Sequence, residues 1–142
     1  MSLQAATVSL RGFYRDGRNV SPGVFLVPLD LSPSDSIVET TCDRGPWQSA
    51  LVVFSRRRIG DFRSASEPHE AFAAALASDL LNLETWLEAH GRQVAAVKAS
   101  GVEMDVFLDL WIEQDQLEIC LPPPLLLACG QLDLKIEMIT ND

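Results

Sequence analysis

The sequence is poor in cysteine: it has three in 142 residues, at positions 42, 120 and 129. None of them forms a Cys-x-x-Cys pair. An odd number of cysteines without ligand spacing is typical of reduced thiols in a cytoplasmic protein. We therefore expect no disulfide and no metal or other cofactor, and we expect Cys120 and Cys129 to be small core residues. The alternative, a zinc site made by these cysteines with His69 and His90, has no spacing to support it.

Long hydrophobic runs are also missing. The longest are Leu125–Cys129 and Ala71–Ala77, far below the roughly 20 residues of a membrane-spanning helix. Met1–Ala6 lacks the basic and then apolar segments of a secretory signal. A chain of this length with 47% hydrophobic residues can bury a core by itself. We expect a single cytoplasmic domain, residues 1–142, with no membrane partner.

Known catalytic motifs are absent as well. The chain contains no Gly-x-Gly-x-x-Gly, Walker-type, Gly-x-Ser-x-Gly or His-Glu-x-x-His sequence, and it has two histidines. A dyad of Cys42 and His69 would rest on residue type alone. His90 precedes Gly91 on an apolar stripe, where a structural role at a helix end is favoured. The sequence thus predicts no catalytic residue and favours a protein that is not an enzyme.

Basic residues are scarce in the second half of the chain. Residues 1–63 contain eight arginines against six acidic residues, a net charge of +2, whereas residues 64–142 contain three basic and fourteen acidic residues, a net charge of −11. Because a surface this acidic repels phosphate backbones, we expect no nucleic-acid partner. The basic run Arg56–Arg58 is more typical of a solvated loop than of a phosphate clamp.

The first half of the chain reads as strands and loops. Residues of high β-propensity predict strands over Thr7–Tyr14 and Trp47–Phe54. The apolar segment Val20–Leu31 contains prolines, which disfavour a long helix. Two alternatives remain for it, a short helical turn and an edge strand. Polar residues with Pro33 and Gly45 predict a loop over Ser32–Gly45.

The strongest helical pattern follows Ser66, which we expect to cap the first turn beside Pro68. Apolar residues then recur at steps of three and four. They are Phe72, Leu76, Leu80, Leu83 and Leu87, with His90 next in phase. The helix either runs on past Gly91 with a kink or breaks there and restarts until Gly101.

The C-terminal third alternates between apolar and polar residues. Val102–Ile112 predicts a half-buried strand, and Leu117–Leu121 predicts its antiparallel hairpin partner. Three prolines then open a short helix, Leu125–Cys129, and a last strand follows over Leu132–Met138. The sequence predicts an α+β fold, an antiparallel sheet of about four to five strands with a long helix packed on one face.

This order of elements resembles the bacterial domain-of-unknown-function family 4279. The resemblance is carried by Gly45 and Trp47 before the second strand and by the stretch Asp79–Ile139, above all Gly101–Leu110 and Leu117–Ile136. The proline-interrupted segment Ser21–Leu31 departs from it, because a helix would be expected there. The resemblance implies an α+β fold and a bacterial cytoplasmic setting, and it implies no activity.

One face of the predicted strand Val102–Ile112 combines carboxylates with aromatic rings. Its odd-numbered positions, continued into the following turn, are Glu103, Asp105, Phe107, Asp109, Trp111 and Glu113. Glu118, Asp133 and Glu137 of later predicted strands would join this face. Such a set could hold a hard cation or a glycosidase-like carboxylate pair, but a solvated sheet face is the favoured interpretation.

Phe107 and Trp111 conflict with a plain solvated face, because large aromatic side chains gain by burial. Either the Val20–Leu31 segment covers them, or they anchor a contact with a second copy or a basic protein. The leading hypothesis is a non-catalytic interaction protein, of the inhibitor or immunity type, that uses this candidate patch. The alternative is a small enzyme or ligand-binding domain whose site assembles from residues distant in sequence.

Overall fold

The computed structural model describes the chain apart from residues 1–2, 17, 19, 21–27, 30–36, 42–47, 114–118 and 142, and apart from the side chains of residues 37–41 and 48. Its elements are β1 (Leu3–Phe13), β2 (Ile37–Thr41), β3 (Gln48–Arg58), the 3-10 turn η1 (Ile59–Phe62), α2 (Pro68–Ala89), α3 (Gly91–Ala99), β4 (Glu103–Ile112), α4 (Pro123–Gln131) and β5 (Lys135–Asn141). The predicted α+β class is confirmed.

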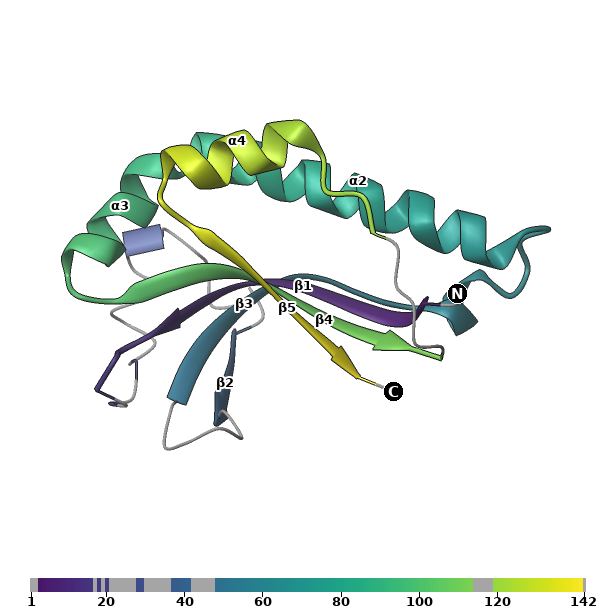
Figure 1. Ribbon diagram of the computed structural model, residues 1–142, viewed down its shortest axis with the longest axis horizontal. Coiled ribbons are helices and arrows are strands. Elements are labelled where there is room, and N and C mark those ends of the chain that lie inside the picture. The colour runs from purple at the N-terminus through teal and green to yellow at the C-terminus, as the bar shows by residue number, and fades with distance from the viewer. Residues whose placement is uncertain are drawn as a thin grey trace.

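The sheet has five strands in the order β2-β3-β1-β4-β5, and it is mixed (Figure 1). All neighbours pair antiparallel except β4 and β5, which are parallel. The predicted antiparallel sheet is therefore wrong at this edge. The chain crosses through α4 between the two strands, and a helical crossover returns the chain in the same direction. The predicted hairpin is wrong too: residues 119–121 form no strand, and Leu117 lies outside the described residues.

The N-terminal half contains one more strand than the sequence predicted. β2 lies within Ser32–Gly45, the segment expected to be a loop, and pairs with β3 from Ile37↔Val52 to Thr41↔Gln48. Its β-branched residues explain the strand. β3 also continues past Phe54 through the arginine run, because β1 begins early enough to pair Ala5 with Arg58.

The helical segment breaks at Gly91, one of the two alternatives. α2 ends at Ala89 and α3 begins at Gly91, with His90 between them. The His90 ring stacks on Trp86 at 4.3 Å between centroids, and its Nδ1 lies 2.9 Å from the Trp86 carbonyl oxygen. His90 thus has a structural place at the helix junction. At the other end Glu67, not Ser66, occupies the N-cap, and no side chain caps α2.

The core lies between the sheet and a helix layer. Figure 1 shows α2, α3 and α4 on the same side of the sheet, so the expected cover by one helix is incomplete. The predicted α2 stripe, from Phe72 to Leu87, is buried in this core. The even-numbered β4 residues Met104, Val106, Leu108 and Leu110 are buried with it. The odd-numbered β4 residues therefore point to the opposite side, here called the open face, which no described helix covers.

The α4–β5 connection is fixed by α3. The Nζ of Lys98 donates hydrogen bonds to the carbonyl oxygens of Leu132 at 2.9 Å and Asp133 at 2.6 Å. Asp133 has a φ of 53° in this turn, so the prediction that it lies on a strand is wrong. No described helix is long and apolar enough to cross a membrane.

Candidate interaction face

The register of β1, β4 and β5 determines which side chains share the open face. Directly paired residues point to the same side of a sheet. Arg11 lies opposite Asp105, and Ser9 lies opposite Phe107. On the other side of β4, Glu137 lies opposite Phe107, and Ile139 lies opposite Asp109. The two β1–β4 pairs bring together residues that are 94 and 98 positions apart in the sequence.

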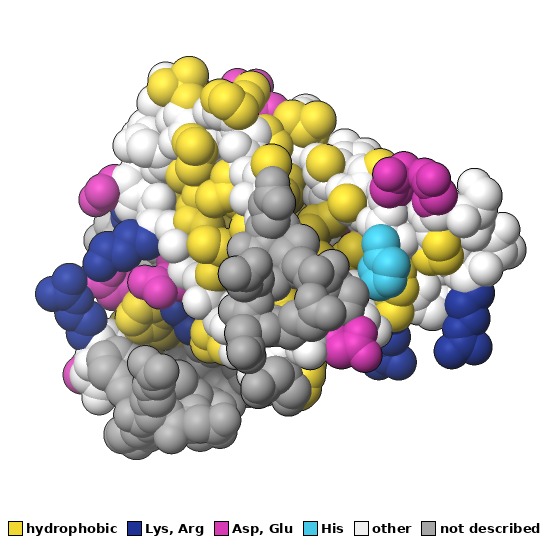
Figure 2. All heavy atoms as spheres, turned by 45° about the vertical axis from the view of Figure 1, so that its right-hand side comes forward, with side chains coloured by type: hydrophobic (Ala, Val, Ile, Leu, Met, Phe, Trp, Pro, Cys, Tyr) yellow, Lys and Arg dark blue, Asp and Glu magenta, His cyan; other side chains and the backbone are white. Residues whose placement is uncertain are grey.

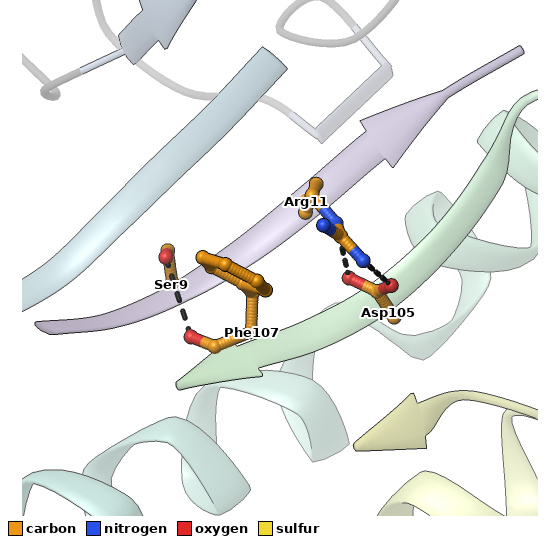
Figure 3. A network of polar contacts seen from close by, with 4 residues as sticks. All are labelled: Ser9, Arg11, Asp105 and Phe107. Carbon is orange, nitrogen blue, oxygen red and sulfur yellow. Dashed lines mark hydrogen bonds and ion pairs between the residues drawn. The ribbon is translucent and has the colours of Figure 1, made fainter. Parts of the chain in front are cut away.

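A buried ion pair occupies the middle of the open face (Figure 3). Arg11 donates to Asp105 through Nε at 3.0 Å and Nη2 at 2.5 Å. The carboxylate belongs to a residue that is only 3% exposed. Fork-like pairing of this kind holds both side chains in one geometry. Asp105 is therefore a structural partner of Arg11 and not a free surface charge.

Phe107 completes this network. The Arg11 guanidinium lies 4.4 Å from the centroid of the Phe107 ring and 5.3 Å from that of Phe13, in cation–π contacts. The Ser9 hydroxyl donates to the Phe107 carbonyl oxygen at 3.4 Å, and Ser9 is fully buried. Phe107 itself is half-buried. The conflict between an aromatic ring and neighbouring carboxylates is thus resolved here by a cation from β1.

Burial controls the protonation of Asp105. Loss of solvent raises the pKa of Asp105 above its ordinary value, and the hydrogen bonds and charge of Arg11 offset only part of this rise. Glu137 on β5 raises the Asp105 pKa further, and Lys135 lowers it. The pKa of Asp105 is therefore set by its burial and by the charges of Arg11, Glu137 and Lys135.

The end of the open face near Trp111 is accessible. Trp111 is 49% exposed and Ile139 is 45% exposed. They are diagonal neighbours across the β4–β5 pair. Around them, Asp109 accepts a hydrogen bond from Asn141 at 2.7 Å, and Glu113 accepts one from Gln4 at 3.2 Å. We call these two apolar residues with Asp109, Glu113 and Asn141 the Trp111 patch.

Glu103 lies at the opposite end of β4 from Trp111. It is bridged by the Nε of Arg15 at 2.7 Å, and both side chains are solvent-accessible. The six residues expected to form one patch therefore divide into three places: Glu103 at one end, Asp105 with Phe107 in the middle, and Asp109, Trp111 and Glu113 at the other end.

Sequence reasoning missed Arg11 and Ser9. Arg11 stands in the N-terminal strand, where odd positions hold Thr7, Ser9 and Arg11 and even positions are small or apolar. This alternation is the signal that could have placed a cation on the polar side of β1. It did not indicate that β1 lies beside β4, which depends on the pairing of strands distant in the sequence.

The carboxylates of this region do not gather into a metal site. Within the described residues no group of three or more His, Cys, Asp or Glu side chains is placed to hold a metal ion. Glu137 does lie on the open face, whereas Asp133 is in the α4–β5 turn and Glu118 lies outside the described residues.

The described cysteines and His69 are found away from this face. Cys129 is buried, and burial raises its pKa to about 11, whereas Cys120 is exposed, so its predicted place in the core is wrong. Cys120 and His69 line a cavity of about 290 Å³ beside α2, together with Leu3, Phe72, Ala73, Leu76, Ala77, Leu80 and Ile119. Cys42, and with it the Cys42–His69 dyad that the sequence disfavoured, lies outside the described residues.

The arginine run proves to be partly structural. Arg56 and Arg58 are exposed, but Arg57 points to the helix side and donates to Asp79 of α2 through Nε at 2.5 Å and Nη2 at 2.8 Å. The hydrogen bonds to Asp79 raise the pKa of Arg57. This pair also escaped sequence reasoning, because Arg57 and Asp79 lie on different elements, 22 positions apart.

No family model, no curated protein and no solved structure matches this chain, so the resemblance to family 4279 stays a prediction.

Proposed function

We propose that this chain is a non-catalytic interaction protein that binds a basic protein through the Trp111 patch. The carrying observation is the half-exposed Trp111 beside the half-exposed Ile139 on a sheet face that no described helix covers. A bacterial cytoplasmic origin, implied by the resemblance to family 4279, belongs to the same proposal.

The composition of the patch favours a protein partner. Tryptophan is enriched at the residues that contribute most to binding energy, and such residues are commonly ringed by polar groups that exclude water. Asp109, Glu113 and Asn141 supply this polar rim around Trp111 and Ile139. The patch thus combines an apolar centre with hydrogen-bonding and charged groups.

The charge of the chain favours a basic partner. The net charge is −9, and residues 64–142 contribute −11. The buried carboxylate of Asp105 is offset by Arg11, whereas Asp109 accepts a hydrogen bond from a neutral side chain, Asn141. The negative charge of Asp109 therefore lies where it would steer a cationic surface towards Trp111. An inhibitor or immunity-type partner of a basic protein fits this character.

Comparative capture tests the proposal. Wild-type protein and Trp111→Ala protein are immobilised and exposed to native lysate at low and high salt. A basic protein should be retained by wild type and lost by Trp111→Ala. After purification of that protein, the substitution should cost about 2 kcal/mol or more of binding free energy, roughly thirtyfold in Kd. Leu127→Ala, at an exposed apolar site of α4, serves as the matched control and should bind as wild type does.

Equal retention by wild type and Trp111→Ala would contradict the use of this patch. If Trp111→Ala and Leu127→Ala both lose the basic protein to the same degree, retention depends on exposed apolar area in general and not on the Trp111 patch. The neutral variants Asp109→Asn and Glu113→Gln add a further check: they should slow association mainly at low salt, because steering by charge is screened at high salt.

A second candidate function rests on the cavity beside α2. Its lining comes from three distant parts of the chain, represented by Leu3, His69 and Cys120, and it is mainly apolar. At about 290 Å³ it approaches the lower size of small-molecule sites. A small apolar ligand would bind there and protect Cys120 from alkylation, whereas binding of a protein at the Trp111 patch would leave the alkylation rate of Cys120 unchanged.

A further inference from the structure

The cavity beside α2 combines an apolar lining with an accessible thiol. Among the described side chains that line this cavity of about 290 Å³, His69 and Cys120 are the polar ones, and Cys120 is exposed to solvent. The remaining lining residues are alanine, leucine, isoleucine and phenylalanine. On the side of the molecule seen in Figure 2, hydrophobic side chains continue from the helix layer towards a histidine. A ligand that fills this cavity therefore needs a hydrocarbon body.

The cavity borders the packed core. Phe72, Leu76 and Leu80 line it and also belong to the buried stripe of α2, with 1%, 4% and 0% of their surface exposed. Ala73 and Ala77, one turn apart on the same helix, are exposed and contribute methyl groups to the lining. A larger side chain at either alanine would occupy the cavity without disturbing the core.

The two described cysteines differ in their surroundings. Cys129 is buried, and burial raises its pKa to about 11, which disfavours the reactive thiolate. Cys120 is exposed and lines the cavity. A thiol in this position can contact a chain in the cavity while its reaction partner and any leaving group stay in solvent. Of these two cysteines, Cys120 is thus the one placed to react with a bound ligand.

We propose that the cavity binds the hydrocarbon chain of an acyl thioester and that Cys120 accepts the acyl group. The sulfur of Cys120 bonds to the acyl carbonyl carbon, the bond from that carbon to the donor sulfur breaks, and the donor thiol leaves with the proton that Cys120 loses. One thioester replaces another, so the step balances without an oxidant or a reductant. The inference rests on the second candidate function, the apolar ligand site beside α2, and is independent of the Trp111 patch.

Burial of the chain gives this reaction a dependence on chain length. Each methylene that enters the cavity strengthens binding about fourfold, and binding that persists in the transition state raises the second-order rate constant. Reaction of a thiol outside a cavity lacks this gain. The net charge of −9 would repel an anionic donor. The suitable probes are therefore the acetyl and octanoyl thioesters of N-acetylcysteamine, a small uncharged thiol.

Acylation by these two probes tests the proposal. The octanoyl probe should acylate Cys120 about a hundredfold faster than the acetyl probe. Ala77→Phe should lower the octanoyl rate to near the acetyl rate and leave the acetyl rate unchanged, because the added ring occupies the cavity. Ala74→Phe, at an exposed position of α2 outside the lining, is the matched control and should react as wild type does. Peptide mass spectrometry gives the rate at each cysteine, and circular dichroism checks that the variants are folded.

Equal rates with the two probes, or faster octanoylation at another cysteine than at Cys120, would overturn the proposal. So would an octanoyl rate that Ala77→Phe leaves unchanged. Octanol, which cannot acylate, separates this failure from failure of the ligand site itself. If octanol slows alkylation of Cys120 by iodoacetamide but the octanoyl probe gains no rate, the cavity binds chains and the acyl transfer is wrong. If octanol gives no protection either, the transfer and the second candidate function are both wrong.

Discussion

The guanidinium of Arg57 in β3 donates two hydrogen bonds to the carboxylate of Asp79 in α2. The two side chains differ in exposure: that of Asp79 is 8% exposed, whereas that of Arg57 is 37% exposed. The pair joins the sheet to α2 at the edge of the core.

This difference in exposure predicts an asymmetric response to mutation. Arg57→Ala leaves a buried carboxylate without a cation, and we expect a loss of about 3 kcal/mol of unfolding free energy. Adding Asp79→Leu to Arg57→Ala should recover part of this loss, because an apolar side chain suits the site. Urea denaturation followed by circular dichroism measures both effects. The neighbouring Arg56→Ala, on an exposed arginine of the same run, should change stability by less than about 0.5 kcal/mol; an equal loss in both variants would contradict the role of Arg57.

The parts of the fold that could be predicted are those with a strong local period. The α2 stripe and the alternation of β4 each repeat over several turns or residue pairs, so the buried sides of both elements were readable. β2 was missed because its five residues lie in a polar segment bounded by Pro33 and Gly45, where local turn signals dominate. The direction of β5 was missed because Leu117–Leu121 alternates like a strand, which hid the β4–α4–β5 crossover.

The candidate site shows where local reasoning ends. The alternation of β4 placed Phe107 and Trp111 on one side, but their different environments come from neighbouring strands. Arg11 lies beside Phe107 because β1 pairs with β4 in one register, although Arg11 and Asp105 are 94 positions apart in the sequence. No periodicity within a single segment contains that information, which requires the strand order and register of the whole sheet.

Leu80 tests the packing of α2. It is fully buried in the core, whereas the next residue, Leu81, is exposed. Leu80→Ala should cost about 2–5 kcal/mol, because it removes buried methyl groups and leaves a cavity. Leu81→Ala should stay within about 0.5 kcal/mol of wild type. Thermal or chemical unfolding of both variants provides the measurement, and a Leu80→Ala protein as stable as wild type would show that this face of α2 is not packed.

Asp105 gives a prediction about pH. Since burial raises its pKa in the folded state above the ordinary 3.8, the folded chain binds more of this proton than the unfolded chain in the range just above that value. The contribution of Asp105 to stability is therefore complete below pH 3.8 and is lost as the pH rises through the folded-state pKa. The stability of wild type minus that of Asp105→Asn should fall as the pH rises through this range. Urea unfolding of both proteins across the acidic range measures it, and a difference that grows with pH would mean that pairing with Arg11 outweighs burial.

The described cysteines should differ in reactivity. Cys120 is exposed, while Cys129 is buried with its pKa raised to about 11, and the thiolate is the form that reacts. At neutral pH iodoacetamide should alkylate Cys120 in the folded protein and should alkylate Cys129 only after denaturation. Peptide mass spectrometry distinguishes the two sites, with Cys120→Ser as the control for assignment. Equal rates at both sites in the folded protein would contradict the burial of Cys129.

Phe107 and Trp111 face the same side of β4, and their surroundings predict opposite effects of truncation. Phe107 is half-buried and lies under the guanidinium of Arg11, so Phe107→Ala removes both apolar contact and a cation–π contact. We expect it to cost about 1–3 kcal/mol. Trp111 is half-exposed, and Trp111→Ala should lower the melting temperature little while it removes the centre of the proposed binding patch. Melting curves of the two variants, set beside their binding to the captured basic protein, test this division directly. If Trp111→Ala unfolds the protein as readily as Phe107→Ala and leaves binding intact, Trp111 belongs to the core and the proposed patch is wrong.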